Sequence, residues 1–251
     1  AWVRHKPAAE GVLLASRMAI SPACAAAIPD GVTDLQALAA AALYLEPALA
    51  IQRIAAARPG ERVLVHEADG PRGRAACDLA RAAGATVLAS ASSFADRDGL
   101  RASGVAHALQ SRDGDLPAAV LDLTASEGAH VIVLAGREAA DDLVVRAAAL
   151  GARVVRLGGA TTPRADAARN AVVGEVDVDA VARTRPVAIR QQLRALLDDL
   201  ASGALDAGAS LPAAAPLADV PQELASAVGP VVVLFEHPRA PVPLPATVRS
   251  R

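Results

Sequence analysis

The chain has 251 residues, of which 53% are hydrophobic but only 2% aromatic, so its core must be built mainly from Ala, Val and Leu. Its formal net charge of −2, with acidic and basic residues interspersed, gives no electrostatic reason to expect nucleic acid or an anionic membrane as a partner. Cys24 and Cys77 form no metal or redox motif, and we expect them to be buried free thiols of a cytoplasmic protein. No apolar run reaches the length of a membrane span, because Arg, Asp, Gly or Pro interrupts each one.

Short apolar segments and turn residues divide the first part of the chain. We predict a strand at 11–15, a helix at 35–42 that begins near Thr33, and a second helix from Glu46 or Pro47 to residue 56. Pro47 would then lie in the first turn of its helix, where its missing N–H costs nothing.

The stretch 62–92 predicts a βαβ unit. An apolar strand at 63–66 is followed by a glycine-containing turn, a helix at about 72–83 and a second strand at 86–91. The turn, Ala-Asp-Gly-Pro-Arg-Gly at 68–73, has the spacing of the G-x-G-x-x-G fingerprint, in which amides at a helix N-terminus face a pyrophosphate.

The alternation of strands and helices continues beyond this unit. Further helices are predicted at 97–102, 116–124 and 139–150, and further strands at 106–109, 130–134 and 153–157. Short strands alternating with helices indicate an α/β fold with a doubly wound, parallel, Rossmann-like sheet.

The C-terminal part has a different pattern. We predict a loop at 158–171, an amphipathic helix at 187–201, a loop at 207–216, a helix at 217–228 and a strand at 231–235. The predicted organisation is a truncated substrate-type subdomain with a connecting helix (1–57), a Rossmann-like domain (58–171), helices and a strand that complete the fold (172–236), and a Pro-rich linker tail (237–251).

Several segments resemble a known family. They are P-D-G at 29–31, R-P-G-E-R-V-L-V-H at 58–66, L-A-R-x-x-G-A-x-V at 79–87, S-R-D at 111–113 and L-G-A-R-V-V at 150–155. Through them the chain resembles the enoylreductase domain of modular polyketide synthases, a branch of the medium-chain dehydrogenase/reductase superfamily. The resemblance implies NADPH-dependent reduction of a double bond on a polyketide held by an acyl carrier protein, with neighbouring synthase domains as partners.

The phosphate-binding turn departs from the A-A-A-G-G-V-G of that family. Pro71 has no N–H, so it removes a possible phosphate donor and restrains the turn. Glu67 and Asp69 place carboxylates where phosphates would lie, and like charges about 4 Å apart repel by roughly 1 kcal/mol in water. Arg72 could offset one of these charges, while Gly70 and Gly73 remain for turning and for helix–strand packing.

Other positions around the expected cofactor also depart from the family. The segment 92–97 lacks the family's lysine; Arg97 could take a 2′-phosphate, but Asp96 beside it disfavours this. Ile-Val-Leu-Ala-Gly at 132–136 lacks the Asn-Ser pair that lines the nicotinamide site. We therefore expect no cofactor and read Gly70-Pro71-Arg72-Gly73 as a vestigial loop.

Five side chains are candidates for chemistry. Glu46, Glu67 and Asp69 could act as general acid and base in the old cofactor cleft, or be loop charges paired with nearby arginines. His66, at the end of the central strand, has a structural or a catalytic role, and Tyr44 packs or donates a hydrogen bond to a substrate carbonyl. The other histidines share no spacing with carboxylates or cysteines, so no metal site is expected.

Three functions fit these residues. The first is a domain that has lost NADPH and promotes a non-redox step, cyclisation above all, on a carrier-bound polyketide. The second is a pseudo-reductase that only braces its neighbours, and the third is an active NADPH-dependent enoylreductase. The acidic replacements favour the first over the second, and the departures around the cofactor disfavour the third.

Overall fold

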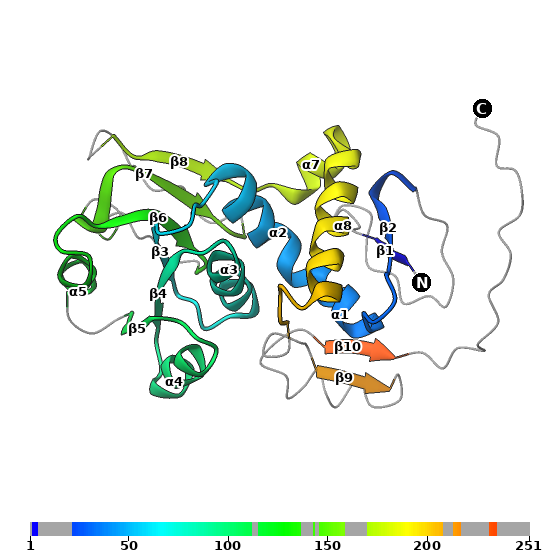
Figure 1. Cartoon of the computed structure of the whole chain (residues 1–251), viewed down its shortest axis with the longest axis horizontal. Coiled ribbons are helices and arrows are strands. Elements are labelled where there is room, and N and C mark those ends of the chain that lie inside the picture. The colour runs from blue at the N-terminus through cyan, green and yellow to red at the C-terminus, as the bar shows by residue number, and fades with distance from the viewer. Residues whose placement is uncertain are drawn as a thin grey trace, which may run out of the picture.

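A computed structural model describes residues 2–4, 22–111, 115–136, 143, 146–158, 170–207, 213–216 and 231–234. At its centre lies a six-stranded sheet in which all neighbouring strands are parallel, in the order β5-β4-β3-β6-β7-β8 (Figure 1). The strands are β3 Arg62–His66, β4 Thr86–Ala91, β5 His107–Gln110, β6 Ala129–Leu134, β7 Ala148–Arg156 and β8 Val172–Glu175. The strand order reverses between β3 and β6, so the predicted doubly wound, Rossmann-like α/β fold is confirmed.

Two features of the sheet were not predicted. The strand β7 begins at Ala148, inside the predicted helix 139–150, because pairing of Ala148 with Ala129 of β6 overrides the helix propensity of alanine. The strand β8 extends the sheet past the predicted domain boundary at residue 171, through pairing of residues 172–175 with the end of β7.

Helices cover both faces of the sheet. The helices α3 Pro71–Ala82 and α4 Phe94–Ala102 pack on the face that presents Val63 and Val65, whereas α5 Leu116–Leu123 packs on the face that presents Leu64 (Figure 1). Apolar side chains of alternating strand positions thus form two separate buried clusters, one on each face.

The N-terminal helices form one continuous helix, Asp34–Ile54. It comprises α1 Asp34–Ala39, a π-helical stretch η3 Ala40–Tyr44, α2 Leu45–Ala48 and a second π-helical stretch η4 Leu49–Ile54. Thr33 caps its start in a capping box with Gln36, as the sequence indicated.

The prediction of two separate helices is therefore wrong, because Pro47 lies in the interior of this helix. A proline there removes one helical hydrogen bond, and the two π-helical stretches on either side of it accommodate the defect. Contrary to the prediction from the apolar runs, this described helix is long and apolar enough to cross a membrane by length and composition. Because 67% of the apolar window is buried inside the fold, a core helix explains the same pattern.

The rest of the described chain packs beside the sheet. The helices α7 Val178–Thr184 and α8 Pro186–Ser202 follow β8, and α8 lies against the long helix (Figure 1). Two small sheets complete the structure: β1 Trp2–Arg4 with β2 Ala25–Ala27, which follows the 3-10 turn η2 Pro22–Cys24, and β9 Ala213–Pro216 with β10 Val231–Leu234. The strand β9 corrects the prediction of a loop at 207–216, and its pairing with β10, a partner remote in sequence, is not visible in a local pattern. The predicted strand 11–15, helix 217–228 and linker tail lie outside the described residues.

Candidate functional site at the switch point of the sheet

Open α/β sheets bind ligands at the carboxyl ends of their strands, where the strand order reverses. We call the carboxyl ends of β3, β4, β6 and β7, with the turn from β3 to α3, the switch-point edge. It contains four of the five candidate side chains, and they come from three elements.

His66 and Glu67 share one buried hydroxyl. The Nδ1 atom of His66 lies 2.8 Å from Oγ of Ser90, and the backbone N–H of Glu67 donates to the same oxygen over 3.1 Å. Ser90 is fully buried, and Glu67 has a φ of 55°, in the left-handed region. The shared hydroxyl therefore holds the chain as it leaves β3, which is the geometry of a structural role for His66.

The carboxylate of Glu67 lies over the loop that follows β6. A Cβ atom placed on Gly136 would lie only 1.3 Å from Oε2 of Glu67, so a glycine is required for the carboxylate to occupy this position. The loop after β6 therefore lies beside the turn that follows β3, because β3 and β6 are neighbours in the sheet.

Of the two roles expected for glycine in the turn, turning and close helix packing, the structure requires only the close packing, at Gly73. A Cβ on Gly73 would lie 2.6 Å from Cα of Ala68, so α3 approaches the turn as closely as the sequence predicted. Gly70 is the N-cap of α3 with an ordinary extended backbone and open space around it, so neither turning nor packing requires glycine there. Pro71 occupies the first turn of α3, where a phosphate-binding helix would offer an N–H.

Asp69 is held toward β4. Its Oδ2 accepts a hydrogen bond from Oγ of Ser92 over 2.8 Å, while its backbone carbonyl accepts one from Nε of Arg74 over 3.2 Å. The same arginine forms an ion pair of 2.9 Å with Asp96 at the start of α4. Arg74 therefore neutralises Asp96 and not Asp69.

Glu46 reaches the switch-point edge from the long helix. Its Oε1 accepts the N–H of Gly158, just after β7, over 2.6 Å, and its Oε2 lies 3.3 Å from Nη1 of Arg72. The Glu46 side chain is 13% exposed and that of Arg72 51%, so the ion pair is partly screened by water. Arg72, which the sequence suggested could offset a charge of the turn, thus pairs with Glu46 of the long helix.

Tyr44 does not join this group. It is fully buried, and its hydroxyl donates to Oδ2 of Asp78 on α3 over 2.7 Å. Asp78 lies two helical turns after Pro71, about 10 Å along the axis, so Tyr44 is separated from the switch-point edge.

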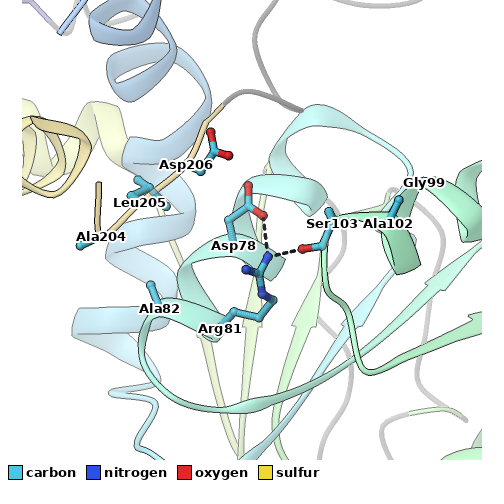
Figure 2. Close-up of a pocket in the computed structure, with 9 residues that line it drawn as sticks. All are labelled: Asp78, Arg81, Ala82, Gly99, Ala102, Ser103, Ala204, Leu205 and Asp206. Carbon is cyan, nitrogen blue, oxygen red and sulfur yellow. Dashed lines mark hydrogen bonds and ion pairs between the residues drawn. The ribbon is translucent and has the colours of Figure 1, made fainter. Parts of the chain in front are cut away.

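Asp78 also lines a pocket of about 590 Å³ between α3, α4 and the chain after α8 (Figure 2). Arg81 bridges its wall, because Nη1 lies 3.7 Å from Oδ1 of Asp78 and donates to the carbonyl of Ser103. The pocket is lined by Asp78, Arg81, Ala82, Gly99, Ala102, Ser103, Ala204, Leu205 and Asp206. The hydroxyl of Tyr44 thus contacts a residue that lines this pocket, although Tyr44 is not among the lining residues.

One residue of the edge was missed from the sequence. Arg156, the last residue of β7, is fully buried, and none of its three guanidinium nitrogens has a hydrogen-bond partner among the described residues. The only sequence signal is a charged residue at the end of the apolar run R-V-V-R-L, which reads equally well as a strand end that faces solvent.

The cysteines and the remaining titratable groups offer no metal site in the described part of the chain. No group of three or more His, Cys, Asp or Glu side chains there could hold an ion. Cys77 is buried, and burial raises the pKa of its thiol, whereas Cys24 is only half-buried; both are free thiols.

Comparison with known proteins identifies the family. A family model described as zinc-binding dehydrogenase matches residues 71–202, which is more than half of the chain. One component of the phenolphthiocerol/phthiocerol polyketide synthase of Mycobacterium tuberculosis is 32% identical over 185 residues, or 71% of this chain. The nucleotide-binding subdomain of the enoylreductase domain of PpsC from that organism is 33% identical, with a TM-score of 0.57 over 65% of this chain and 95% of its own. The chain belongs to the enoylreductase-like domains of polyketide synthases.

Larger solved domains align with more of this enoylreductase-like domain. The CurK enoyl reductase has a TM-score of 0.72 and the CurF ER cyclopropanase of the curacin A pathway one of 0.69; each is 25% identical and covers 85% of this chain and 66% of its own. The chain spans only 8% of the length of the mycobacterial polyketide synthase that it matches. The resemblance read from the sequence motifs is confirmed.

The zinc in the family's name does not fit the residues described here. Protein zinc sites use three or four Cys, His, Asp or Glu ligands, and the described residues bring no such group together. No step of the function proposed below depends on a metal.

Proposed function

We propose that this enoylreductase-like domain no longer binds NADPH and acts at the switch-point edge on a carrier-bound polyketide in a non-redox step, namely cyclisation. The observation that carries the proposal is the turn from β3 to α3, where Pro71 replaces a phosphate donor and the nearby positive charge of Arg72 is engaged by Glu46.

The electrostatics of the turn support the loss of NADPH. A dinucleotide phosphate at the start of α3 would meet the carboxylate of Asp69 nearby, and Arg74 is committed to Asp96. Each carboxylate near a phosphate repels it, more strongly near a protein surface than in water. The residues present therefore do not fit the cofactor that the family implies.

The same acids support a proton-transfer role. Glu67 extends over Gly136 and Glu46 contacts Gly158, so carboxylates approach the carboxyl ends of β6 and β7 from two elements. Ring closure requires a folded chain held at the reacting distance and a group that shuttles one proton, and proximity alone can lower a barrier by about 7–11 kcal/mol. Glu67 is the residue we assign to the proton transfer. Among the related structures, the CurF domain is described as a cyclopropanase, which shows that an enoylreductase-like domain can carry a ring-forming activity.

The partners follow from the domain's place in a synthase. We infer that an acyl carrier protein delivers the polyketide in the cytoplasm and that neighbouring synthase domains flank this one. The curated relatives are themselves polyketide synthases.

An active NADPH-dependent enoylreductase is the second candidate, and one observation favours it. Arg97 follows β4, where a 2′-phosphate would lie, with its guanidinium carbon 5.8 Å from the ring centroid of the exposed Phe94. The acid beside it, Asp96, is neutralised by Arg74, so the acidic neighbour disfavours a phosphate less than the sequence suggested.

Titration with NADPH separates the two candidates. We expect a dissociation constant no better than about 1 mM by calorimetry or cofactor fluorescence, and the double variant Asp69→Ala/Pro71→Gly should bind more tightly. A low-micromolar constant for the unmodified domain would support the active reductase instead.

The proposed chemistry is tested in the intact synthase module. The variant Glu67→Gln should lose ring formation by about two orders of magnitude, because a general acid or base typically contributes 10²–10⁴-fold. Asp122→Asn, on the outer side of α5, is the matched control, and its product should be unchanged. Normal ring formation by Glu67→Gln would leave the pseudo-reductase scaffold as the better account.

A further inference from the structure

Arg156 is a buried cation without a counterion in the described part of the chain. It closes β7, has 0% of its surface exposed, and its Nε, Nη1 and Nη2 atoms meet no hydrogen-bond acceptor among the described residues. By contrast Arg153, three positions earlier in the same strand, forms an ion pair of 2.6 Å with Glu61.

The sheet register fixes where Arg156 lies. It stands opposite Leu134 of β6 and Glu175 of β8 at the carboxyl ends of the three strands. Val154, two positions earlier, belongs to the core cluster of Leu116 on α5, so Arg156 lies on the α5 face of the sheet. Glu175 is exposed and forms no hydrogen bond or ion pair with Arg156 in the described structure.

A guanidinium in this position requires an anion. Arginine stays charged in proteins, and burying an unpaired charge is strongly unfavourable, so buried arginines are almost always paired. Its planar, forked set of donors matches the two oxygens of a carboxylate or a phosphate. Arg156 is the last residue of β7, so its backbone lies at the carboxyl edge of the sheet, where open α/β sheets bind ligands.

We propose that Arg156 binds an oxyanion, a carboxylate or a phosphate, carried by the ligand of the switch-point edge. The inference rests on the part of the proposed function that places a ligand at this edge. It does not depend on whether the domain binds NADPH. β7 is two strands from β3, about 10 Å, so this oxyanion is a different group from a pyrophosphate on the turn before α3. Two parts of a carrier-bound chain supply such a group: a carboxylate of the polyketide, or the phosphate of its phosphopantetheine arm.

The first test is the stability of the ligand-free domain. Arg156→Met replaces the unpaired charge by an apolar side chain of similar length, and we expect the melting temperature to rise by about 2–4 °C. Arg153→Met is the matched control on the same strand, and it should lower the melting temperature because it leaves Glu61 without its partner. A fall for Arg156→Met as large as that of the control would show that a carboxylate of the chain already pairs with Arg156, which would overturn the proposal.

The second test measures oxyanion binding by calorimetry and thermal shift, with glutarate, inorganic phosphate and phosphopantetheine as probes. At least one probe should bind the unmodified domain and Arg153→Met equally, and lose about tenfold or more in affinity in Arg156→Met. Preference for glutarate assigns the site to a polyketide carboxylate, and preference for phosphopantetheine assigns it to the carrier arm. Arg156→Lys keeps the charge without the fork and should bind with intermediate affinity, so the test stands even if the methionine variant does not fold.

Equal affinity in all variants, or no binding of any probe to the unmodified domain, would refute the site. Tight NADPH binding together with Arg156-dependent oxyanion binding would refute the loss of the cofactor and leave this inference intact.

Discussion

Gly70 and Gly73 stand three positions apart in the turn before α3, but a methyl group would meet other atoms at only one of them. We expect Gly73→Ala to lower the free energy of unfolding by about 1–3 kcal/mol, because its Cβ would press on the backbone of Ala68, which cannot give way cheaply. Gly70→Ala should change the free energy of unfolding by less than about 0.5 kcal/mol, since its backbone is extended and its surroundings are open, and the reduced entropy of the unfolded chain offsets the lower preference for alanine at an N-cap. Urea unfolding of the two variants measures the difference, and equal losses would contradict the close approach.

At the level of single side chains, the sequence predicted which acids lie at the switch-point edge better than it predicted the residues that they contact. That Glu46, Glu67 and Asp69 gather at one edge follows from the βαβ pattern and the family resemblance. Their contacts with Gly158, Gly136 and Ser92 do not, because each joins segments far apart in sequence. The partner of Tyr44 could not be predicted for the same reason, because its contact with Asp78 depends on the direction of a helix that was predicted as two.

Among the elements, the strands of the sheet were predicted to within about two residues at most ends, since short continuous apolar runs bounded by turn residues mark strands that are buried on both faces. The continuous helix was missed because Pro47 is a helix-breaking signal unless tertiary packing overrides it. The strands β8 and β9 were missed because their pairing partners, and not their own residues, make them strands.

The helix α8 offers a test of how far its packing supports the fold. Leu196→Ala should lower the free energy of unfolding by about 2–5 kcal/mol, because Leu196 is fully buried in the core cluster. Val187→Ala, at an exposed position of the same helix, should change it by less than about 0.5 kcal/mol. Thermal or urea unfolding provides the measurement, and a small effect at Leu196 would mean that α8 is not part of the core.

In the described part of the molecule, one continuous apolar cluster covers the α3 face of the sheet. It joins Val63 and Val65 of β3 to the long helix and to Leu193 and Leu196 of α8. The strand β8, which begins at Val172, just after the predicted division at residue 171, belongs to the same sheet as β3.

A continuous core predicts cooperative unfolding. Amide hydrogens of α8 and of β3 should exchange with similar protection, close to the free energy of global unfolding, when followed by mass spectrometry. Protection of α8 lower by more than about 3 kcal/mol would indicate that the C-terminal helices open independently of the sheet.

The π-helical stretches of the long helix have a further effect on its geometry. Each acts like one extra residue in an α-helix, so each rotates the residues after it by about 100° around the axis. The stretches lie at 40–44 and 49–54, one on each side of Pro47. Residues three or four positions apart therefore do not stay on one face of the helix where a stretch lies between them. The segments η3 and α2 of this helix each contact both α3 and α8. Removing one residue from the stretch at 40–44 would rotate Glu46 by about 100° relative to α1, although the helix itself would become more regular.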